Sequence, residues 1–73
     1  MIYKIIVLSS VTYALKAQSV LAREGISARL EKLSSDRTLK GCGYGLRIDT
    51  VNLDKASRLL YSEKIKIVEI IDY

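Results

Sequence analysis

The sequence predicts a single α+β domain, a two-layer sandwich built in the order β-α-β-β-α-β. Three observations lead to this prediction. The chain has 73 residues, which gives room for one domain over residues 1–73 and for no second one. Its hydrophobic fraction of 49% is typical of a folded globule rather than of a disordered chain. Short β-branched runs alternate along it with two stretches of helical periodicity.

The first strand and the first helix fill the N-terminal third of the chain. Residues 2–8 form a short, β-branched run that is apolar on both faces over residues 5–8, which is typical of a central strand. Ser9 or Ser10 then offers a side-chain oxygen that caps a helix. The helix is expected to end at Gly25, because glycine adopts a left-handed conformation without a Cβ clash. Its buried stripe is predicted to hold Val11, Ala14, Leu15, Leu21 and Ala22, with Gln18 as the polar member of that face.

Two strands with a long connection between them are predicted next. Residues 27–33 alternate weakly and indicate a half-exposed strand, and residues 34–42 have the composition of a loop. A loop of that length in a small domain is more often functional than decorative. Residues 44–50 alternate again, with Leu46 and Ile48 predicted to face inward.

The last two elements complete the pattern. Asn52 or Asp54 is expected to open a second helix, and residues 65–71 are predicted to form the last strand. The buried stripe of that helix is predicted to consist of Leu53, Ala56, Leu59 and Leu60.

The compact solution for this order is the ferredoxin-like sandwich, a four-stranded antiparallel sheet with both helices on one face. Its spatial strand order is 4-1-3-2, because parallel β-α-β connections are right-handed. This topology brings the end of the first strand to the same edge as the loop between the second and third strands. We therefore expect Ser9, Ser10 and Thr12 to lie near Cys42.

Composition excludes several kinds of chemistry. The chain has no His and one Cys, which removes Ser-His and Cys-His nucleophile pairs, His-ligated metals, Cys-only zinc sites and an intrachain disulfide. No cofactor and no metal are expected. No apolar run approaches the roughly 18 residues that span a bilayer. A single unpaired Cys fits a reducing, cytoplasmic setting.

The charge balance is basic, with 12 Lys and Arg against 8 Asp and Glu. Most of the excess falls in residues 29–47. The bland interpretation is an ordinary solvated face, and the sharper one is a surface that attracts anions. The only Cys lies inside this segment, which favours the second interpretation.

The tripeptide Gly41-Cys42-Gly43 is the most informative motif. Two glycines leave the sulfur without side-chain cover. Lys40 and Arg37 are close in sequence, and the leading turn of the first helix is expected at the same edge. Positive potential stabilises a thiolate, which is the nucleophilic form of cysteine. The alternative is a small buried Cys in a turn, because free Cys is among the most buried residue types.

Taken together, these motifs resemble the selenium/sulfur carrier-like family, long known only as a small domain of unknown function with a Gly-Cys-Gly motif. The resemblance covers roughly residues 3–71. It rests on the runs Ser9-Ser10-Val11-Thr12-Tyr13-Ala14-Leu15-Lys16-Ala17, Gly25-Ile26, Arg29-Leu30, Arg37 and Gly41-Cys42-Gly43-Tyr44-Gly45-Leu46-Arg47. It implies a small carrier rather than an enzyme, with Cys42 accepting sulfur or selenium as a persulfide or selenopersulfide. A cysteine desulfurase or another chalcogen donor, and an acceptor protein, are the partners that this role implies.

Several residues around Cys42 allow two interpretations. Ser9, Ser10 and Thr12 are either plain helix caps or an anion pocket at a helix N-terminus. Arg37 and Arg47 either bind the anionic sulfur, with Lys40, Gly41 and Gly43 beside them, or pair with Asp36 and Asp49 on the surface.

The alternative function is a non-catalytic binding module for a small ligand, a protein or RNA. RNA binding would want aromatic side chains on the open sheet face, where Tyr3 and Tyr44 are the candidates, but no RNP-type string is present. Membrane binding is not expected. A homodimer is a further expectation, from apolar side chains of residues 5–8 and 67–71 on the outer face of the sheet.

Overall fold

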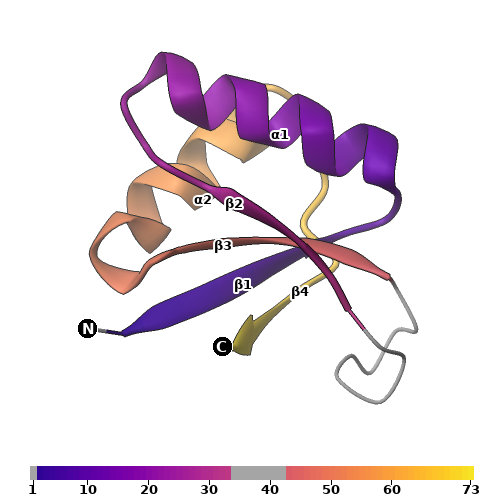
Figure 1. Cartoon of the computed structure of the whole chain (residues 1–73). Helices are drawn as coiled ribbons and strands as arrows, with labels where there is room; N and C mark the ends of the chain where they lie inside the picture. Colours follow the sequence, from indigo (N-terminus) through magenta and orange to yellow (C-terminus); the bar gives the residue numbers. More distant parts are fainter. Residues whose placement is uncertain (1, 34–42) are drawn as a thin grey trace.

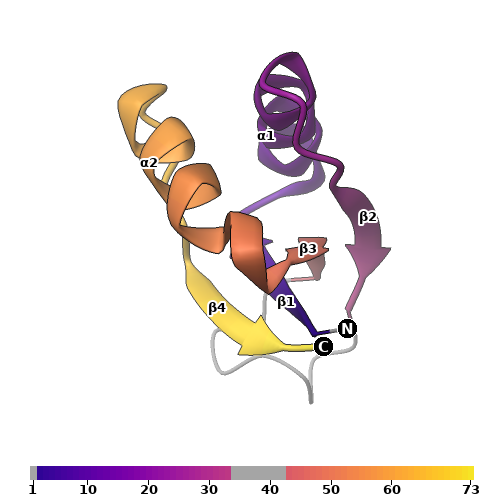
Figure 2. The ribbon, with the colours of Figure 1, turned by 90° about the vertical axis from the view of Figure 1, so that its left-hand side faces the viewer.

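The structure, a computed structural model, describes residues 2–33 and 43–73. One four-stranded antiparallel sheet has the spatial order β2-β3-β1-β4, and both helices cover the same face of it (Figures 1 and 2). The ferredoxin-like prediction and its strand order are therefore confirmed. The elements are β1 (Tyr3–Leu8), α1 (Val11–Arg23), β2 (Arg29–Lys32), β3 (Tyr44–Asp49), the 3-10 turn η2 (Thr50–Asn52), α2 (Leu53–Ser62) and β4 (Glu69–Asp72).

Strand β1 is the centre of the molecule, as its apolar run predicts. It pairs with β3 on one side and β4 on the other, and residues 5–8 are completely buried. Ile6 and Leu8 face the helices and join the main core with Leu46 and Ile48 of β3. The opposite, outer face of the sheet has its own small cluster, in which Ile5, Val7 and Leu33 pack with Val68 and Ile71.

This outer cluster bears on the expected homodimer. The β1 side chains on which that expectation relied are covered within a single chain, since Ile5 and Val7 have no exposed surface. Ile70 of β4 is 41% exposed, but it is the register partner of Ile6 and therefore lies on the helix side of the sheet. The homodimer remains a prediction.

Helix α1 buries a different stripe from the one predicted. Ala14 and Leu21 face the core as expected, but Ala17 and Val20 join them, whereas Leu15 is 48% exposed and Val11 38% exposed. Ala22 is exposed as well. The helix therefore carries two overlapping apolar stripes, the predicted one and the one that is buried. The buried stripe includes two alanines, whose small side chains let the helix approach the sheet closely. The helix ends where expected, with Gly25 at a φ of 76°.

Gln18 is the polar member of the buried face of α1, as predicted. Its side-chain amide donates a 2.8 Å hydrogen bond to the backbone carbonyl of Ala28, in the segment that leads into β2. A buried amide needs such a partner to offset the loss of its hydration. The bond therefore ties the middle of α1 to the start of the edge strand.

Helix α2 opens at Asn52, one of the two predicted residues. A 3-10 turn over Thr50–Asn52 precedes α2, and Asn52 is its N-cap without a side-chain cap hydrogen bond. Ala56 and Leu60 are fully buried, while Leu53 and Leu59 lie half-buried against the same core, so the predicted stripe is confirmed.

The last strand is shorter than the predicted range of residues 65–71. The backbone N–H of Ile65 donates to the carbonyl of Leu60 at the end of α2, so this residue belongs to the helix terminus although its side chain is core. The backbone reaches β1 at Val68, whose N–H donates to the carbonyl of Val7. Regular pairing with β1 covers residues 69–72.

The start of β1 lies beside the end of β4. Lys4 pairs with Asp72 across β1 and β4, and Tyr3 meets Tyr73 edge to face with ring centroids 5.9 Å apart. Among the residues that the structure describes, no helix has the length and hydrophobicity needed to cross a bilayer.

Candidate functional site

Among the described residues of the predicted site, Ser9, Ser10 and Gly43 lie at the end of the sheet where β1 ends and β3 begins. Leu8 is the register partner of Tyr44, so the turn into α1 and the residue before β3 leave the sheet at the same edge. The backbone N–H of Leu33, just after β2, donates a 2.7 Å hydrogen bond to the carbonyl of Gly43. We call Leu8–Ser10, Leu33 and Gly43–Tyr44 the α1 rim.

The N-terminus of α1 opens onto this rim. Ser10 has an extended backbone with a φ of −158°, and its hydroxyl accepts a 3.3 Å hydrogen bond from the backbone N–H of Tyr13. The structure thus gives Ser10 the predicted cap role, while Ser9 and Thr12 are exposed beside it. The first turn contains no acidic residue. A helix N-terminus carries roughly half a positive charge, and no carboxylate in this turn offsets it.

At the rim, the described residues leave space around Gly43. Among the described residues, the atom nearest to a Cβ placed on it would be the carbonyl oxygen of Leu33, at 4.0 Å. The contrast is Gly45, where a Cβ would lie 2.5 Å from Cγ2 of Ile5. Close packing therefore requires glycine at position 45, while no described residue requires it at position 43.

Arg47 does not lie at the rim. It is three residues further along β3 than Tyr44, a separation of roughly 10 Å along an extended strand. Its guanidinium carbon lies 5.1 Å from the ring centroid of Tyr3 and 4.5 Å from that of Tyr73. Its Nε is 3.6 Å from a carboxylate oxygen of Glu31, so the acidic partner is Glu31 of β2 rather than Asp49.

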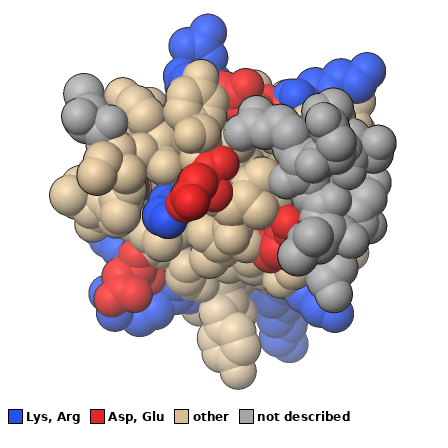
Figure 3. Space-filling model, turned by 90° about the horizontal axis from the view of Figure 1, so that it is seen from below, with Lys and Arg blue, Asp and Glu red and all other residues tan. Residues whose placement is uncertain are grey.

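The outer sheet face that carries Arg47 has a mixed charge. Figure 3 views the molecule from this side and shows basic groups around the margin with acidic groups among them, and apolar or uncharged surface between. Tyr3 lies on this face, as the RNA interpretation required, but Tyr44 does not. Tyr44 packs against the main core on the helix side, because β3 alternates and even-numbered residues face the helices. One of the two aromatic candidates for base stacking is therefore wrong.

The remaining site residues lie outside the described part of the chain. These are Arg37, Lys40, Gly41 and Cys42. Within residues 2–33 and 43–73, no group of three or more His, Cys, Asp or Glu side chains is placed to hold a metal ion.

Tyr73 contacts Arg47 together with Tyr3 and Glu31, a contact that was not predicted from the sequence. It lies 26 positions after Arg47 and beyond the last predicted strand, so no local spacing linked the two. One signal in the sequence was strand alternation, which puts the odd-numbered residues of β4 on the same face as Tyr3. It identifies Tyr73 as a neighbour of Tyr3 only when the register between β1 and β4 is known.

Comparison with known proteins supplies the family. The sequence model of the family described as "Putative Se/S carrier protein-like" matches residues 3–72, nearly the whole chain. Among curated proteins and solved structures, none matches. Because the match spans both helices and all four strands, the chain belongs to the Se/S carrier protein-like family.

Proposed function

We propose that the protein carries sulfur or selenium as a persulfide or selenopersulfide on Cys42. Family membership over residues 3–72 is the observation that carries the proposal. The geometry of the α1 rim supports it, because Gly43 follows Cys42 directly in the sequence and lies at the edge where α1 begins.

The loading step is a sulfur transfer without net oxidation. The Cys42 thiolate attacks the outer sulfur of a donor persulfide, a new S–S bond forms on Cys42, and the donor leaves as a thiolate. Delivery is the same reaction in the other direction, with a thiolate of the acceptor attacking the outer sulfur on Cys42. A persulfide-forming enzyme such as a cysteine desulfurase suits the donor role, and a second protein suits the role of acceptor.

The rate of loading depends on the population of thiolate. The positive end of α1 favours the anion, and Ser9, Ser10 and Thr12 surround that end with hydroxyl groups. Arg37, Lys40 and the backbone of Gly41 and Gly43 are proposed to complete the cationic surroundings. Arg47 is left out of this role, since Glu31 and two tyrosine rings hold it on the outer face.

The direct test is loading followed by intact-mass spectrometry. The reduced protein is incubated with a cysteine desulfurase and cysteine, desalted, and weighed, and one added sulfur atom per chain is expected. Cys42→Ser should take up none. The matched control is the double variant Cys42→Ser/Ser19→Cys, which moves the thiol to an exposed position of α1 away from the rim. It should load far more slowly than the wild type. Equal loading of the two would contradict a dedicated site.

A second measurement follows the rate at which a thiol reagent modifies Cys42 across pH. The proposal expects a midpoint below about 8.5, the ordinary value for a thiol, because the rate rises as the thiolate forms. A midpoint at or above that value, or no reaction without denaturant, would favour the non-catalytic binding module instead.

A further inference from the structure

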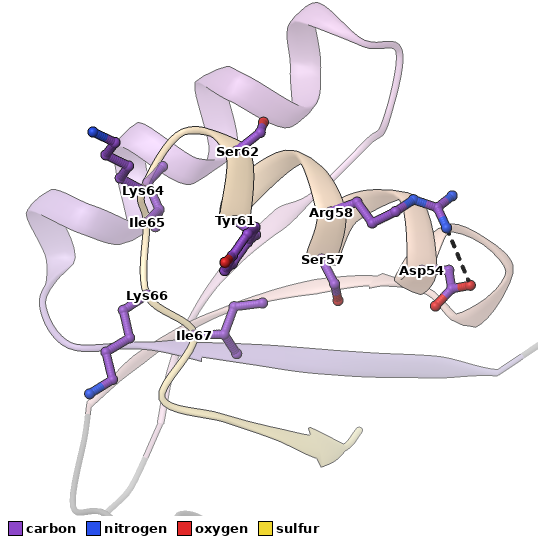
Figure 4. A pocket seen from close by; sticks show the side chains of 9 residues that line it. All are labelled: Asp54, Ser57, Arg58, Tyr61, Ser62, Lys64, Ile65, Lys66 and Ile67. Carbon is purple, nitrogen blue, oxygen red and sulfur yellow. Dashed lines mark ion pairs between the residues drawn. The ribbon is translucent and has the colours of Figure 1, made fainter.

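A groove separates α2 from the segment that leads into β4. It has a volume of about 1120 Å³ and is open to solvent. Figure 4 shows the side chains of Ser57 and Tyr61 on its α2 side and that of Ile67 on the other. Neither the sequence motifs nor the proposed sulfur chemistry accounts for it.

The groove exists because the backbone turns sharply after α2. Lys64 adopts a left-handed conformation with a φ of 61°, and its N–H donates to the carbonyl of Tyr61. The next residue, Ile65, folds its side chain into the core and is only 2% exposed. Regular pairing of β4 with β1 starts only at Glu69, so the segment of residues 64–67 forms the far wall of the groove.

The lining is mainly apolar. Ile67 supplies the apolar surface opposite α2, since it packs against the main core while staying partly open, whereas Ile65 is turned into the core. Tyr61 is 85% exposed on the last turn of α2, although its ring is a large hydrophobic group. Such a surface gains free energy when apolar side chains of a ligand cover it.

The margins of the groove are basic. Arg58, Lys64 and Lys66 line it, and Asp54 is the acidic residue among its lining groups. Figure 4 shows Lys64 and Lys66 directed outward at one end and Arg58 beside Asp54 at the other. The 3.7 Å pair of Arg58 with Asp54 is exposed on both sides, so salt and water weaken it. The excess positive charge is concentrated around the two lysines.

We infer that this groove binds an extended acidic segment of a partner protein, with apolar side chains over Ile67 and Tyr61 and carboxylates at Lys64 and Lys66. The apolar wall argues against a nucleic acid, whose phosphates would need donors along the groove instead of hydrocarbon. Opposite charges at the margin and hydrocarbon in the centre are the usual arrangement of a peptide-binding surface.

The wall of the groove continues to the neighbourhood of the α1 rim. Val68, which follows the groove wall directly, donates its N–H to the carbonyl of Val7 near the end of β1. A protein bound along residues 64–67 would therefore approach the rim that holds the N-terminus of α1. The inference does not depend on the chemistry of Cys42, and Cys42→Ser should leave this binding unchanged.

The test uses the full-length protein labelled with nitrogen-15 and two short peptides. In one peptide isoleucine alternates with glutamate, and in the other isoleucine alternates with lysine. The acidic peptide should shift the amide signals of Ser57, Tyr61, Lys66 and Ile67, and the basic peptide should not. An oligouridylate titrated in the same way tests the nucleic-acid alternative.

Substitutions distinguish specific binding in the groove from nonspecific electrostatic attraction of an acidic peptide to a basic protein. The double variant Lys64→Glu/Lys66→Glu should bind the acidic peptide with an affinity at least about tenfold lower. Lys55→Glu is the matched control, since Lys55 is exposed on α2 and does not line the groove, and it should change binding by less than about twofold. Tyr61→Ala should weaken binding without loss of stability, because the ring is largely exposed.

Three outcomes would overturn the inference. One is that the acidic peptide causes no shifts up to millimolar concentration. Another is that the peptide binds but shifts the amide signals of residues outside the groove, or that Lys55→Glu lowers its affinity as much as the double substitution of Lys64 and Lys66 does. The third is that oligouridylate shifts the groove signals and the acidic peptide does not.

Discussion

The side chain of Ile5 lies directly over the backbone of Gly45 on the outer face of the sheet. A Cβ at position 45 would come 2.5 Å from Cγ2 of Ile5, 3.0 Å from the carbonyl oxygen of Ile6 and 3.3 Å from Cδ1 of Leu33. Glycine at this point of β3 therefore allows the outer cluster to close over the central strand.

Gly45→Ala should destabilise the protein by about 1–3 kcal/mol, because the new methyl group overpacks a site that includes fixed backbone. Gly43→Ala is the matched control: its Cβ would meet no described residue nearer than 4.0 Å, so a change within about 0.5 kcal/mol is expected. Urea unfolding followed by circular dichroism measures both. Equal stability of the two variants would show that the contact with Ile5 is not tight.

Arg47→Ala should cost about 1–2 kcal/mol, since it removes two cation–π contacts and the partner of Glu31. Arg47→Lys should recover only part of this, because an ammonium cannot stack as a planar guanidinium does. Arg58→Ala removes an exposed pair within α2 and should change stability by no more than about 0.5 kcal/mol. Losses of the same size at both arginines would contradict a special role for the tyrosine rings.

Gln18→Ala should destabilise by about 1 kcal/mol or slightly more, because the carbonyl of Ala28 loses its donor in a part-buried position. Amide hydrogen exchange should quicken most in β2, the edge strand that this bond steadies. Ser19→Ala, on the exposed side of the same helix, is the control and is expected to be neutral or slightly stabilising. The interpretation fails if exchange in β2 does not change.

Ser10→Ala tests the cap of α1. The hydrogen bond to Tyr13 is long at 3.3 Å, so the loss should fall at the low end of the range for N-caps, about 0.5–1 kcal/mol. Thermal unfolding monitored at helix wavelengths is a sufficient measurement. Ser9→Ala serves as the comparison and should change stability less, because Ser10 holds the cap position.

Ser10→Asp separates stability from reactivity. A carboxylate at this position is also a good cap and suits the helix dipole, so the folded state should be retained. The same negative charge at the α1 rim should disfavour the Cys42 thiolate and slow its modification by a thiol reagent roughly twofold or more at neutral pH. Ser19→Asp adds the same charge away from the rim. If it slows the thiol equally, the rim has no particular influence on Cys42.

The strand pattern made the topology predictable, while the helix faces were harder. In β3, the apolar residues at 46 and 48 alternate with charged ones at 47 and 49, which fixes the face of the strand that turns toward the helices. In α1, Leu15 is more hydrophobic than Ala17, yet the alanine is buried and the leucine exposed. A ranking by hydrophobicity alone would bury the leucine. Because α1 packs closely against the sheet, the smaller side chain is buried instead. The spacing between helix and sheet follows from the packing of the two layers and cannot be read from the helix sequence.

The end of the chain shows a second limit. Residues 65–68 have the same β-branched composition as a strand, but Ile65 bonds to the last turn of α2 and its side chain completes the core. In the candidate site, alternation correctly placed Arg47 away from the helices. Its aromatic partners stand at the start of β1 and directly after β4, and only the pairing of these two strands brings Tyr3 and Tyr73 together.

The adjacent ends of β1 and β4 have a practical consequence. Tyr3 and Tyr73 sit at the edge of the sheet opposite to the α1 rim, one length of β1 away, which is roughly 20 Å for a six-residue strand. A fluorescent protein or an affinity handle fused after residue 73 would therefore stand clear of Ser10 and Gly43. A short flexible bridge between the two ends would also allow the chain to be reopened elsewhere, giving permuted versions with the same sheet.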